Sequence, residues 1–196
     1  MEEKTKKLLQ WHTAFYAGIQ IELEPESENL IFENEHMLGT KPMQVDVLIT
    51  KKDAEKSIKK NIGQIFRKYN LIEYKSPDDY VSINDFYKVL GYAYTFIADT
   101  ARVNEIKCEE VSLSFVSLKY PRKLIKHLLS RGYKLEKKHK GIYYIHGEKL
   151  AIQLLVCFGL PEEENLWLKN LTNKITDTAS VEKLARAYEG KKDNEL

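Results

Sequence analysis

Two short apolar segments with charged residues at their centres constrain this chain most. Residues 43–49 carry Asp46, and residues 70–76 carry Glu73 and Lys75 among apolar neighbours. Successive side chains of a strand alternate between its faces, so Glu73 and Lys75 share one face of their strand. A buried charge is costly unless it is paired or bound to a metal. Pairing the two strands with their charged faces aligned gathers two carboxylates and one ammonium group.

A plainer interpretation of these charges stays open. The chain holds five Glu-x-Lys tripeptides, so the tripeptide alone carries little weight. Lys75 could form a salt bridge with Glu73 or Asp46 on a half-exposed sheet face, without any catalytic role. The combination favours a site, because only this tripeptide lies in an apolar strand-like segment and the upstream strand adds an aspartate.

Composition predicts an ordinary folded α/β protein. The 196 residues are 43% hydrophobic and 31% charged, which suits one domain with a proper core. No apolar segment approaches the roughly 20 residues that span a membrane, and the first residues lack the pattern of a signal peptide. Cys108 and Cys157 lie far apart and are expected to be reduced. The sequence therefore predicts a cytoplasmic protein that does not enter a membrane.

The net charge of +2 says little, but the charges are segregated along the chain. Residues 20–35 contain six Glu and no Lys or Arg, residues 51–75 contain eight basic and three acidic residues, and residues 119–140 contain nine and one. This pattern suits an acidic cation site flanked by basic surfaces that face phosphates. Each basic segment taken singly could equally be a solvated helix face.

Residues 4–23 are expected to form a helix that ends before Pro25. Its apolar stripe has spacings of three and four, contains His12 as an expected core residue, and has Glu22 at its edge. Glu22 is thus a third candidate acid. A strand over residues 18–24 is the competing interpretation, and Glu35 is a weaker candidate acid.

The following elements alternate between strands and helices. Residues 30–38 and 43–50 are predicted to form a hairpin around a turn at 39–42, and residues 51–67 a short basic helix. A strand over 70–75, a helix capped at Ser82 and a strand over 111–117 follow, and such a crossover makes the two strands parallel. The remaining third has a helix between Pro121 and Gly132, strands over 133–137, 141–146 and 150–158, and helices over 161–171 and 181–188, with a frayed end.

This order of elements resembles the core of the PD-(D/E)XK nuclease superfamily, the restriction-endonuclease-like fold. The amino-acid sequence of several segments is most similar to that of a bacterial branch related to the recombination-promoting nuclease/putative transposase group. Those segments are residues 15–23, 32–36, 44–49, 62–67, 72–77 and 85–92. The resemblance implies a nuclease-like core over residues 1–118 (helix, three-strand meander, crossover helix, parallel strand), with an α+β extension over 119–196 packed on the same domain.

The resemblance also implies the roles of the site residues. Asp46, Glu73 and the backbone carbonyl of Tyr74 would bind Mg²⁺ or Mn²⁺, and Glu22 would reach a second metal or a metal-bound water. Lys75 would hold and help to deprotonate the attacking water. The implied activity is Mg²⁺-dependent hydrolysis of nucleic-acid phosphodiesters, usually in DNA.

Other residues and other functions stay open. The five histidines lack metal-ligand spacing, whereas Lys88 and Tyr92 lie four residues apart on a predicted helix and could contact phosphate. Tyrosines interleaved with lysines permit base stacking. A nucleic-acid-binding or interaction module without turnover and a ribonuclease are the alternative functions. A homodimer is left open as well.

Overall fold

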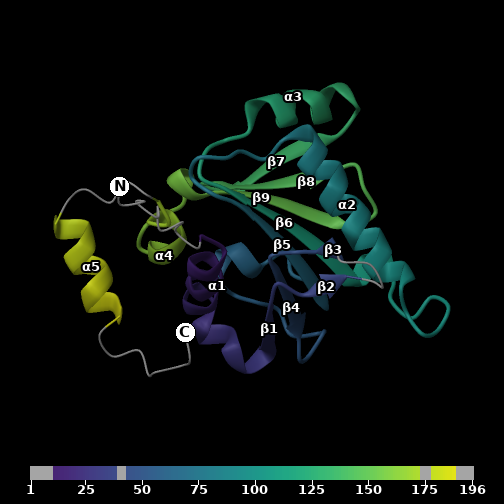
Figure 1. Ribbon diagram of the computed structural model, residues 1–196, viewed down its shortest axis with the longest axis horizontal. Coiled ribbons are helices and arrows are strands. Elements are labelled where there is room, and N and C mark those ends of the chain that lie inside the picture. Colours follow the sequence, from purple (N-terminus) through teal and green to yellow (C-terminus); the bar gives the residue numbers. More distant parts are fainter. Residues whose placement is uncertain (1–10, 39–42, 173–177, 189–196) are drawn as a thin grey trace, which may run out of the picture.

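A mixed seven-stranded sheet organises the computed structural model, which describes residues 11–38, 43–172 and 178–188 (Figure 1). Its strand order is β1-β4-β5-β6-β9-β8-β7. β5 pairs in parallel with β6 and β6 with β9, whereas all other neighbours are antiparallel. The strands are β1 (Leu30–Asn34), β4 (Val47–Lys51), β5 (Tyr69–Lys75), β6 (Val111–Ser117), β7 (Lys134–His139), β8 (Ile142–His146) and β9 (Ala151–Val156). A separate ribbon pairs β2 (Met37–Leu38) with β3 (Met43–Gln44).

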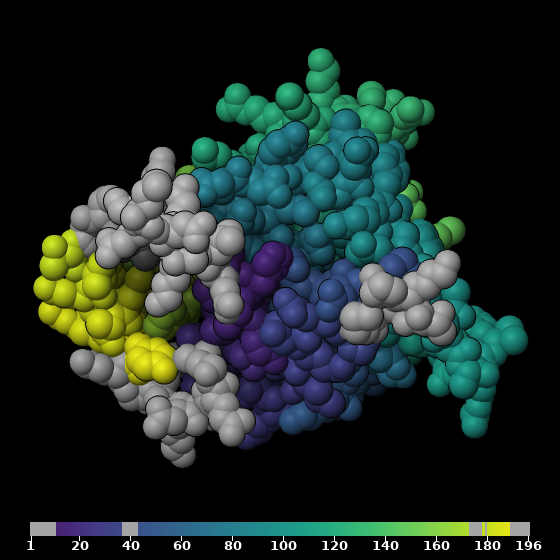
Figure 2. Space-filling view, viewed as in Figure 1, coloured from purple at the N-terminus to yellow at the C-terminus, as the bar shows by residue number. Residues whose placement is uncertain are grey.

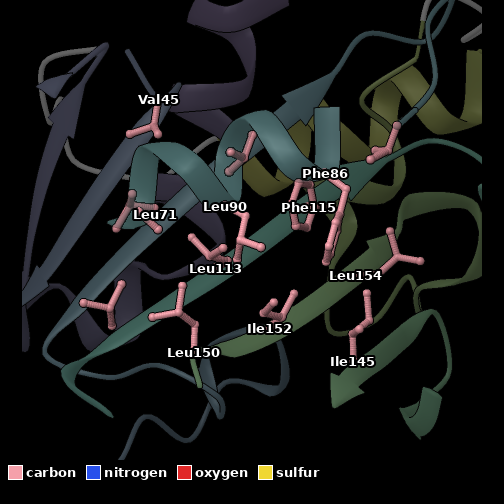
Figure 3. Close-up of a cluster of buried hydrophobic side chains, with 14 of the residues drawn as sticks. Val45, Leu71, Phe86, Leu90, Leu113, Phe115, Ile145, Leu150, Ile152 and Leu154 are labelled. Atoms are coloured by element: carbon pink, nitrogen blue, oxygen red, sulfur yellow. The ribbon is translucent and has the colours of Figure 1, made fainter. Parts of the chain in front are cut away.

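Helices cover both faces of this sheet. The helical elements are α1 (Trp11–Glu22), α2 (Ile83–Ala98), α3 (Arg122–Ser130), α4 (Leu166–Lys169) and α5 (Thr178–Tyr188), with 3-10 turns η1 (Glu24–Asn29), η2 (Asn61–Gly63), η3 (Cys108–Glu110) and η4 (Cys157–Gly159). Buried residues of α2 and α3 pack with Leu71, Leu113 and Phe115 (Figure 3). Buried residues of α1 and α4 join a second cluster with Ile72 and Tyr74. The result is a sheet between two helical layers.

The crossover at the centre of the fold forms as the sequence predicts. β5, α2 and β6 follow one another, and β5 and β6 are parallel in the register Lys75↔Ser117. The Ser82 side chain accepts a hydrogen bond from the Asp85 backbone, and the Asp85 side chain accepts one from the Ser82 backbone. This capping box starts α2 where the local pattern predicts it. The three strands predicted between residues 133 and 158 also form, in the same sheet as β6.

Three predicted elements are wrong in extent. The strand over 30–38 breaks at Glu35, whose φ is 44°, and the strand over 43–50 breaks at a bend at Asp46. Over 161–171 only α4 is an α-helix. The described part of the helix over 4–23 is α1, whereas the turn at 39–42 and the chain end from 189 lie outside the described residues.

The helix predicted over residues 51–67 does not form. The segment contains turns and the single 3-10 turn η2. Its apolar residues at helical spacing are buried nonetheless, because the segment folds as a compact loop over the α1 side of the sheet. Asn61 accepts the Ile62 N–H through its own side chain, and a Cβ on Gly63 would lie 2.6 Å from Ile58 Cγ2. Close loop packing has overridden a helical pattern.

Replacing Gly141 with alanine should destabilise the protein strongly. Gly141 has φ +77°, and an added Cβ would lie 2.6 Å from both the Gly159 carbonyl carbon and the Leu160 nitrogen. Strain and overpacking together should lower the free energy of unfolding by about 3 kcal/mol, measured by urea denaturation. Gly132→Ala is the matched control, because Gly132 has φ +86° but nothing within 4 Å of the added atom. Equal losses for the two variants would contradict this account.

Within the described ranges, no helix has both the length and the apolar composition needed to cross a membrane.

Candidate functional site

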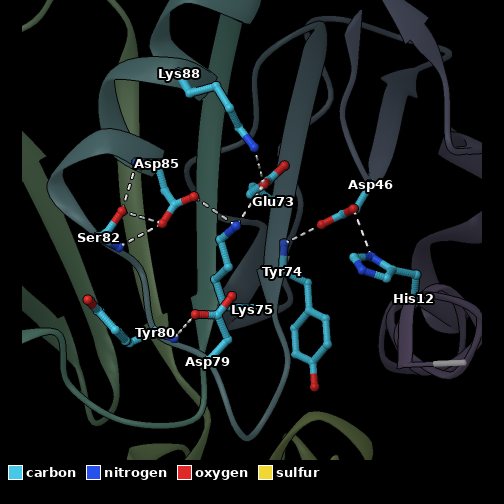
Figure 4. A network of polar contacts seen from close by, with 10 residues as sticks. All are labelled: His12, Asp46, Glu73, Tyr74, Lys75, Asp79, Tyr80, Ser82, Asp85 and Lys88. Carbon is cyan, nitrogen blue, oxygen red and sulfur yellow. Dashed lines mark hydrogen bonds and ion pairs between the residues drawn. The ribbon is translucent and has the colours of Figure 1, made fainter. Parts of the chain in front are cut away.

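Glu73 and Lys75 lie on the α2 side of β5, on the same face as Leu71, as strand alternation predicts (Figure 4). Lys75 Nζ lies 3.4 Å from Glu73 Oε1 and 2.9 Å from Asp85 Oδ1 in the first turn of α2. Both strand side chains are largely buried, with 7% of Glu73 and 13% of Lys75 exposed. A buried carboxylate and ammonium group thus share one pocket with a second carboxylate behind the lysine.

Asp85 holds Lys75 because it is itself fixed by the cap of α2. Its Oδ2 accepts hydrogen bonds from the Ser82 backbone N–H and hydroxyl, which leaves Oδ1 for the lysine. Burial alone would raise the pKa of Asp85, but the hydrogen bonds from Ser82 and the Lys75 ammonium outweigh it and lower the pKa. Burial likewise opposes the charged form of Lys75, yet Asp85 and Glu73 raise its pKa. Lys75 therefore stays an ammonium group.

Asp46 reaches the site from the neighbouring strand, at the bend that precedes β4. The pairing Val47↔Ile72 places it beside Glu73 in the antiparallel register. Its Oδ2 accepts the Tyr74 backbone N–H at 2.7 Å, and its Oδ1 lies 2.8 Å from His12 Nδ1 on α1 (Figure 4). The aspartate thus bridges β4, β5 and α1.

Simple alternation along residues 43–49 does not describe this segment. Val45 and Leu48 lie in the same core cluster, although alternation places them on opposite faces. The bend at Asp46 interrupts the regular alternation of side chains between the two faces, because β3 pairs with β2 while β4 pairs with β1 and β5. The Asp46 side chain consequently meets the β5 backbone and α1, rather than the α2 face where Glu73 makes its contacts.

The two carboxylates are held in an environment that disfavours their charge. Burial raises the pKa of Glu73, and the nearby Asp46 raises it further, while Lys75 and Lys88 oppose the shift. Burial also raises the pKa of Asp46, against hydrogen bonding from Tyr74 and the charges of His12 and Lys75. At both carboxylates, burial therefore outweighs the stabilising effect of the neighbouring cations. A divalent cation suits such a pair, because carboxylate oxygens are hard ligands.

Tyr74 contributes its backbone to the site and its ring to the core. Its ring stacks on Phe15 of α1, with centroids 4.6 Å apart and planes at 5°. Burial is the main reason why the pKa of its hydroxyl is raised. The ring anchors α1 to β5 and so fixes the helix that carries His12.

The structure separates Glu22 from Asp46 and Glu73. Glu22 Oε2 lies 3.0 Å from Lys60 Nζ, and Oε1 accepts the backbone N–H groups of Trp167 and Leu168 in α4. His12 and Glu22 are ten residues apart on α1, a rise of about 15 Å. Glu22 therefore joins α1 to α4 and the loop at Lys60, and its predicted role as a third acid of the site does not fit this position. Glu35, the weaker candidate, is an exposed residue in the turn after β1.

His12 is the residue that sequence reasoning misjudged. It is expected in the core, but 53% of its side chain is exposed and its ring contacts Asp46. The packing of α1 buries Phe15 and Ile19 of the stripe but leaves His12, near the start of the helix, open to solvent. Helical spacing alone does not tell which positions of a stripe the tertiary packing covers.

Lys88 lies at the site, whereas Tyr92 lies beside it. Lys88 Nζ is 3.7 Å from Glu73 Oε1 and 5.6 Å from the Tyr92 ring centroid. The Lys88 side chain is 46% exposed, so it could meet a ligand at the rim. Tyr92 is partly buried against the α2 core and supports Lys88.

Over residues 11–38, 43–172 and 178–188, no group of three or more His, Cys, Asp or Glu side chains is arranged to hold a metal ion. A cation here would have two carboxylates, a peptide carbonyl and water as ligands, which suits Mg²⁺ because it keeps several waters. Comparisons of the chain with protein-family models, curated proteins and solved structures found no match. The chemistry of the site therefore follows from its own side chains.

Mg²⁺ or Mn²⁺ should raise the melting temperature, and this effect should disappear on acidification. A cation that binds only the folded state stabilises it, and it competes with protons for Asp46 and Glu73. Burial raises the pKa of both carboxylates above their ordinary value of about 4. As the pH is lowered, the stabilisation by metal should therefore begin to decrease at a pH higher than that value. Differential scanning fluorimetry across pH measures it. An unchanged response in Asp46→Asn would contradict cation binding here.

Proposed function

We propose that this protein is a Mg²⁺-dependent nuclease that hydrolyses phosphodiester bonds of DNA, with the restriction-endonuclease-like core that the sequence resembles. One observation carries the proposal: the adjacent strand places Asp46 opposite Glu73, close enough for its charge to raise the pKa of Glu73, and Lys75 lies 3.4 Å from Glu73. The element order supports it, because α1, the β1-β4-β5 meander, α2 and parallel β6 occur in the order of that core.

Asp46, Glu73 and the Tyr74 carbonyl would hold the metal ion. When bound, such an ion polarises a phosphoryl oxygen and lowers the pKa of its water. Within the described residues, the contacts of Glu73 with Lys75 and Lys88 both fall on Oε1, which leaves Oε2 for a ligand. Asp46 would use a remaining lone pair, because its Oδ2 already accepts the Tyr74 N–H and its Oδ1 contacts His12. The residues thus fit the group, although Glu22 does not contribute.

Lys75 would orient the attacking water and stabilise negative charge at phosphorus. An ammonium group has three donors, and two of those of Lys75 point to Asp85 and Glu73. The third is available to water or phosphate. Because Asp85 and Glu73 favour the ammonium form, Lys75 acts as a donor and not as the base that removes the proton.

Cleavage assays test the proposal. The wild-type protein should cut plasmid or single-stranded DNA with Mg²⁺ or Mn²⁺ and lose this activity with EDTA, and Asp46→Ala should be inactive. Parallel digests of RNA of the same sequence separate a deoxyribonuclease from a ribonuclease. No cleavage of either polymer, together with salt-dependent binding, would replace the proposal with a nucleic-acid-binding module.

A module that keeps the fold without turnover is a second candidate because of one contact. Lys75 Nζ lies closer to Asp85 than to Glu73, at 2.9 Å against 3.4 Å. A lysine held by a capping-box aspartate could serve the stability of α2 alone. Asp85→Asn separates the two roles, because an amide oxygen keeps the cap and loses the charge. It should leave cleavage within about tenfold of wild type if Lys75 serves catalysis through Glu73 and the substrate.

A further inference from the structure

The C-terminal ends of three parallel strands, β5, β6 and β9, lie side by side near Lys75. Lys75 pairs with Ser117 at the end of β6, and Ser117 pairs with Val156 at the end of β9. The chain therefore leaves all three strands at the same edge. We call this surface the C-terminal edge and define it by Tyr80, Lys119, Arg122, Lys123 and Phe158.

Two large aromatic side chains are exposed at this edge. Tyr80 lies on the loop from β5 to α2 and is 58% exposed, and Phe158 lies in η4 after β9 and is 52% exposed. The Phe158 N–H donates to the Leu118 carbonyl at 3.2 Å, which places it next to the segment that leads into α3. Both rings follow the ends of parallel strands and are open to solvent, so they are available to a ligand at this edge.

The segment that follows β6 carries several exposed basic side chains. Lys119, Arg122, Lys123 and Lys126 are exposed, whereas Leu124, Ile125 and Leu128 hold α3 against the sheet. In the described part of the chain, no ion pair engages any of these four cations, and α3 projects from the molecule beside α2 (Figure 2). Four cations on the open side of one short segment create a field that attracts phosphates.

Acidic residues bound this basic surface. Asp78 and Asp79 precede Tyr80 on its loop, and Asp79 accepts the Tyr80 backbone N–H. Glu162, which follows η4 along the chain, pairs with Lys183. A polyanion would therefore contact the α3 side of the edge.

We propose that the C-terminal edge binds single-stranded nucleic acid, with bases stacked on Tyr80 and Phe158 and phosphates on Lys119, Arg122 and Lys123. Aromatic platforms joined to a basic track are the physical basis of single-strand binding, because unpaired bases expose their faces. A duplex keeps its bases stacked on each other and would use only the cations. This inference rests on the proposed nuclease function, and it makes single-stranded nucleic acid the substrate of that nuclease.

Binding without turnover tests the surface separately from the chemistry. Fluorescence anisotropy with EDTA compares a labelled single-stranded oligonucleotide with its duplex. The wild type should prefer the single strand about tenfold or more, and Tyr80→Ala and Phe158→Ala should each weaken single-strand binding about tenfold. Arg122→Glu with Lys123→Glu should weaken both ligands about 100-fold and lower the salt dependence.

Matched controls lie at other parts of the sheet. Lys52 and Lys59 are exposed on the loop after β4, and Ile31 is 45% exposed on β1. Lys52→Glu with Lys59→Glu and Ile31→Ala should each leave binding within about twofold, while circular dichroism confirms folding. Equal affinity for single strand and duplex, unchanged by the ring variants, would overturn the inference even if cleavage occurs. Single-strand binding that depends on the edge, with no cleavage, would support the surface and refute the nuclease.

Discussion

Replacing Lys75 with methionine should reduce Mg²⁺-dependent cleavage by about 1000-fold, in line with the loss of one preorganised donor to a developing charge. Methionine fills much of the volume of the lysine stem in a pocket where only 13% of the side chain is exposed. The melting response to Mg²⁺ should persist, because Asp46 and Glu73 remain. Single-turnover cleavage and differential scanning fluorimetry measure the two effects.

Lys88→Met is the matched control for this loss. Lys88 contacts the same oxygen of Glu73 at 3.7 Å, but its side chain is 46% exposed. Because solvent screens an exposed charge, its removal should cost no more than about tenfold in cleavage. Equal losses for the two lysines would show that they act only through the local field, and an active Lys75→Met protein would refute its assigned role.

Replacing Glu73 with glutamine should abolish cleavage and at the same time stabilise the metal-free protein. Cleavage should fall about 1000-fold or more, because the amide cannot supply charge to the cation. Burial and the neighbouring Asp46 raise the pKa of Glu73 in the folded state. The unfolded chain therefore ionises first as the pH rises, so stability falls between the unfolded and the folded pKa.

Above that window the wild type bears the full cost of ionised Glu73, and glutamine does not. The variant should melt at a higher temperature than the wild type without metal at alkaline pH. This advantage should vanish below about pH 4, where the wild-type carboxyl is protonated in both states. Thermal melts with EDTA across pH test it, and a lower melting temperature of the variant at every pH would contradict the account.

Replacing Glu22 with glutamine tests whether the effects of Glu73→Gln arise from the site or would follow from replacing any buried glutamate. Burial also raises the pKa of Glu22, but its partners are Lys60 and the α4 backbone. Cleavage and the response to Mg²⁺ should stay within about twofold of wild type, because the substitution lies outside the site. A loss comparable to that of Glu73→Gln would return Glu22 to the site.

Much of the central architecture can be predicted from the sequence because local rules specify it. An apolar segment gives β5 and alternating apolar residues give β6, a capping box starts α2 at Ser82, and a strand–helix–strand connection makes the strands parallel. The face shared by Glu73 and Lys75 follows from the same alternation. These features depend on residues close together in the chain, so the pattern contains them.

The positions of Asp46, Glu22 and His12 could not be predicted in this way. The bend at Asp46 arises because its two flanking strand segments pair with different partners. Glu22 is bound by backbone groups 145 and 146 residues away, and His12 meets Asp46 only because α1 packs against β4 and β5. The helical pattern over 51–67 failed for a similar reason, since its apolar residues fill a loop packed on α1.

The sequence by itself determined which residues carry charge on strands and which strands run parallel, because strand alternation and helix capping act over a few residues. Only the tertiary structure decided which carboxylates meet, which one instead joins two helices, and which aromatic rings stay exposed at the sheet edge. Those outcomes depend on packing between distant segments, whose contact energies no local pattern encodes.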